Sequence, residues 1–373
     1  MRLLRIVLQV VFVVAVAALL GYIYDNLVAN LRRAGIRTDF GFLDQPAGFE
    51  IAGSSFRSTE RVRNALVVGL LNTAALAGVG VILTTVLGVV VGVARLSSNW
   101  LVRRTATLYV ETLRNIPPLL VIVFMFTAVI LQLPTIQQAT DLGIAVVSNR
   151  DLAVAAPEFG QGSGAFLGLS AVGVVLAVMV AVWRTRQEDT TGKPHHRVAW
   201  GAAVFLALTV GGWMALGRPV GLSRPEVVGL GVEGGITLKA AYVAMLVALV
   251  LYTASHVAEI VRGSIQAVPR GQTEAATALA LSDFQRLRFV ILPQAARIAL
   301  PPLINQYLNF VKNTSLAVAI GFPEVTSMAI IVISNGSPAP QVIGLVMLFY
   351  LLLSLVISGL SNLVNRRLRL AER

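Results

Sequence analysis

The chain has 373 residues, of which 56% are hydrophobic and only 13% are charged. Soluble proteins carry about 25% charged residues, so this composition excludes an ordinary soluble domain and indicates a helical protein with several membrane spans. The absence of cysteine excludes disulfides and thiol chemistry. The net charge of +12 would indicate nucleic-acid binding in a soluble protein. Here the arginines flank apolar segments, as the positive-inside rule requires, so no nucleic-acid partner is expected.

Apolar runs in the first half of the chain predict four membrane spans. These spans cover residues 6–24, 65–93, 110–131 and 165–183. The first is too long for a signal peptide and is not followed by a small-residue cleavage site, so we expect it to be retained. A polar connector, residues 26–64, and a polar external loop, residues 132–164, separate the spans.

Four more spans are predicted in the second half of the chain. They cover residues 199–216, 238–261, 303–320 and 342–363. Eight spans place both termini and the basic segment 262–297 in the cytoplasm. The connector 26–64 is then external although it carries six arginines, which is the one conflict with the positive-inside rule.

The basic segment interrupts this apolar sequence with two short predicted helices. Pro269 and Gly271 end the incoming helix, and the alanine-rich residues 272–281 favour a short helix. Ser282 with Gln285 three residues later predicts a capping box and a second short helix that ends near Pro293. Two short helices joined by a tight turn between membrane spans are typical of a docking element rather than of a catalytic loop.

The same segment resembles the signature of ATP-binding-cassette (ABC) importer permeases. That signature is Glu-Ala-Ala, three residues, Gly, nine residues, Ile, one residue, Leu-Pro. Here it reads Glu274-Ala275-Ala276, with Ala280 at the Gly, Val290 at the Ile, and Leu292-Pro293 in place. A left-handed turn costs Ala about 1 kcal/mol relative to Gly. Either the turn differs at Ala280 or this strain is tolerated.

Further motifs resemble the polar amino-acid subgroup of these permeases. They are Glu259, Arg262-Gly263, Pro269-x-Gly271-Gln272, Glu111-x-x-Arg114-x-x-Pro117 and Lys312-x-Thr314-Ser315-Leu316. The resemblance implies an all-α membrane protein with a five-helix, MetI-like core on the second, third, sixth, seventh and eighth spans. The three remaining spans are additions, and this layout is similar to one permease subunit of the general L-amino-acid importers.

This resemblance implies a division of the chain. Residues 1–64 form an N-terminal span and external loop, residues 65–131 and 238–373 form the two parts of the core, and residues 132–237 form an insertion with two extra spans. Residues 262–297 carry the cytoplasmic coupling helices. The residues expected to contact the ATPase are Arg262, Gly263, Pro269, Gly271, Gln272, Glu274, Ala275, Ala276, Ala280, Leu292 and Pro293.

The family resemblance also implies the function and the partners. The chain would be the inner-membrane permease subunit of an ATP-driven amino-acid importer, embedded in lipid beside a second, homologous permease chain. Two ATPase subunits would hold ATP and magnesium, and a periplasmic binding protein would deliver the amino acid. The chain itself lacks a phosphate-binding Gly-x-x-x-x-Gly-Lys-Ser/Thr loop and a metal-ligand pattern, so it is expected to be a transport subunit without cofactor rather than an enzyme.

Polar residues inside the spans are candidates for the substrate path, because such residues usually face the interior of a helix bundle. They are Asn72, Thr73, Glu111, Arg114, Glu259, Lys312, Asn313, Thr314 and Ser315. Spacing alone predicts that Glu111 pairs with Arg114 and Glu259 with Arg262, since residues three apart share a helix face. Lys312 needs a partner within the membrane, either in the bundle or in the carboxylate of a passing amino acid.

Two alternative functions remain open from the residues alone. In a secondary transporter driven by an ion gradient, Glu111, Glu259 and His256 would be relay groups. In a membrane scaffold, no residue would carry transport. Neither alternative requires a basic docking element with two capped helices.

Overall fold

The structure is a computed structural model that describes residues 2–35, 38–191 and 196–368. The chain divides into two compact units. We call Met1–Val129 with Ala241–Arg373 the core unit, and Ile130–Ala240 the inserted unit.

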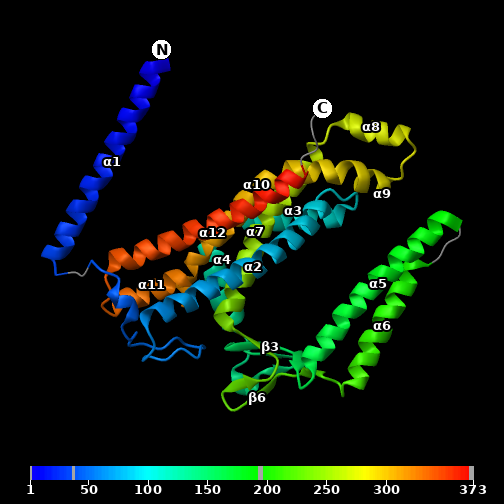
Figure 1. Ribbon diagram of the computed structural model, residues 1–373, viewed down its shortest axis with the longest axis horizontal. Helices are drawn as coiled ribbons and strands as arrows, with labels where there is room; N and C mark the ends of the chain where they lie inside the picture. Colours follow the sequence, from blue (N-terminus) through cyan, green and yellow to red (C-terminus); the bar gives the residue numbers. More distant parts are fainter. Residues whose placement is uncertain (1, 36–37, 192–195, 369–373) are drawn as a thin grey trace. The chain divides into compact units, whose positions relative to one another are not determined.

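The core unit is helical (Figure 1). Its first part contains α1 (Arg2–Arg33), η1 (Gly41–Asp44), α2 (Val62–Ala94), α3 (Trp100–Arg114), α4 (Pro118–Phe124) and the π-helical η2 (Met125–Ile130). Its second part contains α7 (Ala240–Gln266), α8 (Arg270–Ala278), α9 (Asp283–Arg286), the π-helical η4 (Leu287–Ile291), α10 (Leu292–Asn313), the 3-10 helix η5 (Thr314–Ile320), α11 (Val325–Ser334) and α12 (Ala339–Leu368).

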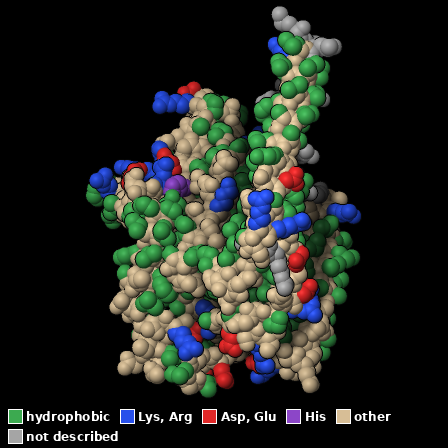
Figure 2. Space-filling view, turned by 90° about the vertical axis from the view of Figure 1, so that its left-hand side faces the viewer, with side chains coloured by type: hydrophobic (Ala, Val, Ile, Leu, Met, Phe, Trp, Pro, Cys, Tyr) green, Lys and Arg blue, Asp and Glu red, His purple; other side chains and the backbone are tan. Residues whose placement is uncertain are grey.

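Seven helices within the described residues are long and apolar enough to cross a membrane, and a bent helix pair brings the number to eight. The predicted class, a helical protein with about eight spans, is therefore confirmed. Hydrophobic side chains spread over the visible face of the molecule, with charged side chains in separate groups among them (Figure 2). The first span is longer than predicted: α1 continues to Arg33, because no glycine or proline occurs after Tyr24 until Gly35.

The predicted third span, residues 110–131, is not one helix. The helix α3 ends at Arg114, and α4 begins at Pro118 after a bend of 105°. Pro117 and Pro118 have no backbone N–H, and a proline disfavours helical geometry in the residue before it, so the helix cannot continue through them. Glu111 and Arg114 therefore lie on α3, before the bend.

The inserted unit combines a helical hairpin with short antiparallel strands. The hairpin consists of α5 (Ser163–Thr191) and α6 (Arg197–Ala215). The strands are β1 (Thr140–Asp141), β2 (Ala145–Val147), β3 (Asp151–Val154), β4 (Ala156–Phe159), β5 (Val220–Ser223), β6 (Glu226–Val228), β7 (Gly231–Glu233) and β8 (Ile236–Lys239), and η3 (Ile136–Gln138) precedes them. They form a sheet in the order β1-β2-β3-β8 and the pairs β4-β5 and β6-β7. The loops expected to be polar connectors thus carry strands that the sequence analysis did not predict.

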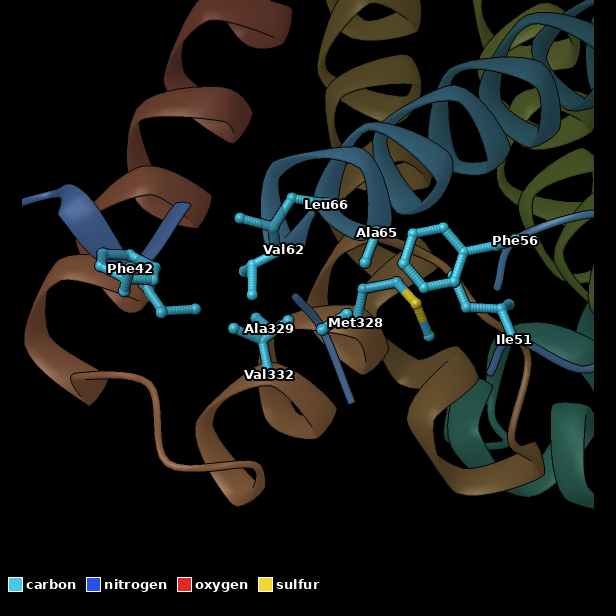
Figure 3. Packing of buried hydrophobic residues seen from close by; sticks show 11 residues of the cluster. Phe42, Ile51, Phe56, Val62, Ala65, Leu66, Met328, Ala329 and Val332 are labelled. Carbon is cyan, nitrogen blue, oxygen red and sulfur yellow. The ribbon is translucent and has the colours of Figure 1, made fainter. Parts of the chain in front are cut away.

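Within the core unit, one end of the bundle is closed by a hydrophobic cluster (Figure 3). Phe42 of η1 and Phe56 of the following loop pack with residues of α2 and α11, including Val62 and Met328. Nearby, Asp44 forms ion pairs with Arg61 at 3.2 Å and Arg63 at 3.0 Å. These contacts fold part of the connector back onto the bundle, and they neutralise part of its unexpected positive charge.

Glycines on α2 allow neighbouring helices to approach closely. A Cβ at Gly80 would lie 2.1 Å from Phe310 Cζ, and one at Gly92 would lie 2.7 Å from the backbone oxygen of Ala258 on α7. Small residues at helix contacts are the usual basis of packing in a membrane, where lipid removes the hydrophobic driving force. The contact at Gly92 is with backbone, so a side chain there cannot be accommodated by a rotamer change.

This packing predicts that Gly92→Ala destabilises the protein whereas Gly78→Ala on the same helix does not. Overpacking of a close contact costs about 1–3 kcal/mol, and a Cβ at Gly78 meets nothing within 4 Å. The measurement is the melting temperature of each purified variant in lipid nanodiscs. Equal melting temperatures for the two variants would contradict this role of Gly92.

Candidate functional site

The basic segment forms the predicted tight turn between two helices. The turn follows α8, where the backbone N–H of Ala280 donates to Thr277 O at 2.9 Å and that of Leu281 donates to Ala276 O at 3.1 Å. These two bonds define a Schellman motif, in which one residue adopts the left-handed conformation. That residue is Ala280, with φ of 56°. The alternative left open by the sequence is thus resolved: the turn is kept and Ala280 carries the strain.

The second helix begins with the predicted capping box. Ser282 Oγ accepts from Gln285 N at 3.3 Å, and Gln285 Oε1 accepts from Ser282 N at 2.9 Å. The expected end near Pro293 is wrong, because α9 continues through η4 into α10. Pro293 directly follows the π-helical turn as the second residue of α10, and its missing backbone N–H leaves one hydrogen bond of the continuous helix unformed.

We call residues 267–294 the docking segment. It lies at the opposite end of the core unit from α11 (Figure 1). Gln294 Nε2 donates to Gln272 Oε1 at 3.0 Å and holds α8 against the start of α10. Ala276 is buried within the segment itself, whereas Glu274 and Ala275 are exposed.

The docking segment exposes four large apolar side chains, of which Leu292 is the least exposed at 40%. Leu279 is 75% exposed, Phe284 66% and Phe289 63%. The remaining predicted coupling residues are distributed around them: Arg262 and Gly263 lie in the last turns of α7, Pro269 caps α8, Gly271 lies in its first turn, and Leu292 begins α10. Clustered apolar side chains that the chain leaves uncovered are typical of a protein interface.

Five charged residues from α3, α7 and the residue after α2 meet next to the docking segment. We call Arg95, Glu111, Arg114, Glu259 and Arg262 the inner charge cluster. Arg95 has a side chain only 8% exposed and pairs with both Glu259 and Glu111, the latter at 3.3 Å. Arg262 donates to Glu259 Oε1 at 2.5 Å, so that predicted pair is present. The predicted Glu111–Arg114 pair is wrong: Arg114 Nη1 instead lies 3.7 Å from Glu259 Oε2.

The polar residues of α2 make structural contacts far from this cluster. Asn72 Nδ2 donates to Pro323 O at 2.8 Å, and Thr73 Oγ1 accepts from Val325 N at 3.1 Å. Both bonds fix the start of α11 against α2. They therefore place Asn72 and Thr73 at the start of α11, away from the charged path residues Glu111, Arg114 and Glu259.

Glu324 anchors the same turn from the other side. Its fully buried carboxylate accepts from the backbone N–H of Thr326 at 2.9 Å and of Ser327 at 2.6 Å, and from Tyr350 Oη at 3.1 Å. A buried carboxylate is tolerated when hydrogen bonds satisfy it and a helix N-terminus lies beside it. Thr314 is buried near this group, with its Oγ1 3.4 Å from Tyr350 Oη.

A cavity of about 240 Å³ lies between α4, α7 and α10. Its lining residues are Pro118, Tyr252, Thr253, His256, Gln306, Asn309 and Asn313. The volume is below the roughly 300–1,000 Å³ typical of sites for drug-sized ligands. It therefore suits a single small molecule, and we call it the central pocket.

The central pocket contains polar groups that the protein leaves unsatisfied. Thr253 is only 2% exposed, and in the described protein its Oγ1 has no hydrogen-bond partner. Across the described residues, the side-chain amides of Gln306, Asn309 and Asn313 also make no hydrogen bond. Thr253 is buried, and buried polar groups normally have a partner, so its hydroxyl points to water or to a polar ligand. Gln306 and Asn313 are half-buried and Asn309 is exposed, so their amides remain available to the same ligand.

His256 adds an acceptor to this pocket. Its Nδ1 lies 3.2 Å from the backbone oxygen of Tyr252, which favours a hydrogen on Nδ1 and leaves Nε2 as an acceptor. Sequence reasoning singled out His256 and Asn313 but missed Thr253, Gln306 and Asn309. The spacing of the three amides, at i, i+3 and i+7 in an apolar helix, was a signal that could have found them.

Comparisons with known proteins agree with this architecture. Residues 84–370 match the family of the binding-protein-dependent transport system inner membrane component. The chain is 39% identical to the putative amino-acid ABC transporter permease protein YhdX of Escherichia coli, over 98% of this chain and 94% of that protein. It is 36% identical to the general L-amino acid transport system permease protein AapQ of Rhizobium johnstonii, over 98% and 92%. It is 35% identical to the glutamate/glutamine/aspartate/asparagine transport system permease protein BztB of Rhodobacter capsulatus, over 99% and 94%.

A helical protein with seven to eight candidate membrane spans that matches transport permeases along its length is a subunit of a membrane transport system. The chain belongs to the family of binding-protein-dependent transport system inner membrane components. It is accordingly an ABC importer permease subunit and not an enzyme.

The Schellman turn generates a test of the docking segment. Replacing Ala280 with Gly removes a left-handed strain of about 1 kcal/mol and should slow hydrogen exchange of the Leu281 amide roughly fivefold. Ala278→Gly, in the last turn of α8, should have the opposite effect, since Gly weakens a helix by a similar amount. Hydrogen exchange read by mass spectrometry distinguishes the two. Faster exchange in Ala280→Gly would contradict the strained turn.

Proposed function

We propose that the chain is the permease subunit of an ATP-driven amino-acid importer of the bacterial inner membrane, with both termini in the cytoplasm. The importer contains two ATPase subunits, which hold ATP and magnesium. The docking segment of this chain binds to an ATPase. A second, homologous permease chain completes the path, and a periplasmic amino-acid-binding protein delivers the substrate. The names of the relatives support amino acids as the transported class.

The observation that carries this proposal is the exposed apolar surface of the docking segment. Leu279 lies between the candidate spans Ala240–Gln266 and Asp283–Ile320, and Phe284 and Phe289 lie in the first turns of the second, with no part of the described chain covering them. Buried aromatic and aliphatic anchors supply most of the energy of a protein interface. An ATPase surface that receives α8 and α9 gives these side chains a partner.

The contacts of the charged residues disfavour transport driven by an ion gradient. That alternative needs Glu111 and Glu259 to bind and release protons or cations. In the structure both carboxylates are paired with arginines, and Glu259 is within ion-pair distance of three of them. The comparisons likewise offer no relative of that class.

The central pocket is the proposed resting place of the amino acid. A zwitterion requires donors and acceptors in close proximity, and the lining residues of the pocket carry two hydroxyls, three amides and an imidazole. Of the path residues predicted from the sequence, Asn313 lines the pocket directly. Lys312 lies beside it but has no carboxylate partner in the described chain, so we assign its partner to the second permease chain.

The docking proposal predicts loss of the ATPase from variants with a smaller apolar surface. Leu279→Ala and Phe284→Ala should each weaken ATPase binding about 10- to 100-fold, the range expected for interface anchors worth 1–3 kcal/mol. The measurement is the amount of ATPase that co-purifies with the permease, followed by amino-acid uptake. Thr277→Ser is the matched control, because Ser keeps the hydrogen bond of Thr277 Oγ1 to Thr273 O. Normal co-purification of both alanine variants would refute this docking surface.

The pocket proposal makes a prediction at Thr253. Thr253→Val keeps the shape but removes the hydroxyl, so amino-acid binding should weaken about 5- to 100-fold if that hydroxyl bonds the substrate. Thr253→Ser should bind normally. If Thr253 were only structural, removal of an unsatisfied hydroxyl would raise the melting temperature and leave binding unchanged. Binding to the purified permease–ATPase complex, measured beside its melting temperature, separates the two outcomes.

A further inference from the structure

One arginine of the inner charge cluster has hydrogen-bond donors that no group of the described protein accepts from. Arg95 and Arg262 each hydrogen-bond a glutamate, and Arg262 also donates to Gln266 Oε1 at 2.7 Å. Arg114 makes no hydrogen bond within the described protein; its one ionic contact is at 3.7 Å, beyond hydrogen-bond distance. A guanidinium has five N–H donors, so Arg114 retains its full capacity to bind an anion.

The net charge of the cluster also leaves Arg114 free to bind an anion. Three arginines face two glutamates, which leaves one positive charge in excess (3 − 2 = 1). Arg95 is buried and bridges both glutamates, while Arg114 is 38% exposed. The excess charge is therefore accessible at Arg114.

Arg114 does not line the central pocket, but it contacts Glu259 of α7, just beyond the pocket residues of that helix. Along α7, Glu259 follows the pocket residue His256 by three positions, which is just under one helical turn. Across the bend after α3, Arg114 precedes the pocket residue Pro118 by four positions. The spacing along α7 and the spacing across the bend after α3 thus both place Arg114 near one end of the pocket.

The pocket offers the substrate carboxylate neutral donors, from its hydroxyls and amides, but no cationic one. None of its lining residues is Lys, Arg, Asp or Glu, and its acceptors, the amide oxygens and His256 Nε2, suit an ammonium group. A carboxylate is bound best by the planar fork of an arginine, which can donate two parallel hydrogen bonds. Arg114 carries such a fork and makes no hydrogen bond in the described protein.

We propose that Arg114 is the carboxylate-binding subsite of the central pocket. The α-carboxylate of the amino acid binds the Arg114 guanidinium, while its ammonium faces the amides and His256. This inference rests on the proposed function, because it requires an amino acid in the pocket. It gives Arg114 a different role from Arg262, which braces Glu259.

The test uses the permease–ATPase complex in lipid nanodiscs without the binding protein, so that only the permease selects the ligand. Each of the twenty L-amino acids is added, and the rise in melting temperature gives its half-saturating concentration. The amino acid that binds most tightly is then compared with its α-amide, which lacks the carboxylate. The wild-type complex should bind the amide about 10- to 100-fold more weakly, as expected for loss of a charge-assisted hydrogen bond.

In Arg114→Gln, binding of the amino acid should weaken by the same 10- to 100-fold, and the preference over the α-amide should disappear. Arg114→Lys keeps the charge and should retain part of the preference. Arg262→Gln is the matched control from the same cluster: it can lower the yield of folded protein, but the preference should persist.

The outcomes separate this inference from the proposed function. An unchanged preference in Arg114→Gln overturns the role of Arg114, whereas weakened binding in Thr253→Val in the same assay still supports the pocket. If no amino acid stabilises the wild-type complex at millimolar concentration, both the pocket and its carboxylate subsite are refuted. The docking proposal is then judged separately by ATPase co-purification.

Discussion

Close helix contact along α2 is the constraint on which the core unit depends. Gly69 faces Met328 and Val325 at α11, and Gly80 faces Phe310 of α10. Gly88 and Gly92 face α7. At about 100° per residue, Gly80 lies about 20° around the helix from Gly69, and Gly88 lies about 100° from it. One helix thus holds α10 and α11 on one side and α7 on another, which opens the space between α7 and α10 where the central pocket lies.

The contacts of α2 also show at which level along the helix bundle each site lies. From Gly69 to Arg95 there are 26 residues, or about 39 Å of helix, against a hydrocarbon core of about 30 Å. Gly88 contacts Ala254 and Val257, at the level of the pocket, whereas Gly92 contacts Ala258 and Val261, one turn nearer the inner charge cluster. The cluster therefore lies near the membrane boundary on the side of the docking segment. Its charges reach water there, and a buried arginine such as Arg95 is compensated by its glutamates.

Local signals in the sequence predicted local structure well. The capping box at Ser282 and the turn at Ala280 depend on residues within a few positions of each other, so both could be predicted. The family resemblance supplied the helical class and the permease function, which the comparisons confirm. The strands of the inserted unit were missed because they are only two to four residues long and lack a sustained alternating pattern.

Contacts between distant residues could not be read from spacing. The rule for residues three apart gave the pair Glu259–Arg262 correctly but also predicted Glu111–Arg114, which does not form. A further partner of Glu259, Arg95, is 164 positions away. The bend at Pro117 changes which helix carries Arg114, and only the packing of α3 against α2 and α7 decides which charges meet. The path residues of the sequence analysis remain a prediction for the same reason.

The order of sites along α7 connects the docking segment with the substrate. This helix carries pocket residues at Thr253 and His256, then cluster residues at Glu259 and Arg262, and it ends at Gln266, just before α8. A helix transmits an axial or tilting displacement along its length because its hydrogen bonds resist local deformation. On the proposed function, an ATPase that moves α8 displaces Glu259 relative to Arg95 and Arg114 before it reaches the pocket. The contact between Glu259 and Arg114 is the longest in the cluster and is not a hydrogen bond. The donors of Arg114 can therefore bind the proposed substrate carboxylate while Arg95 and Arg262 keep Glu259 in place.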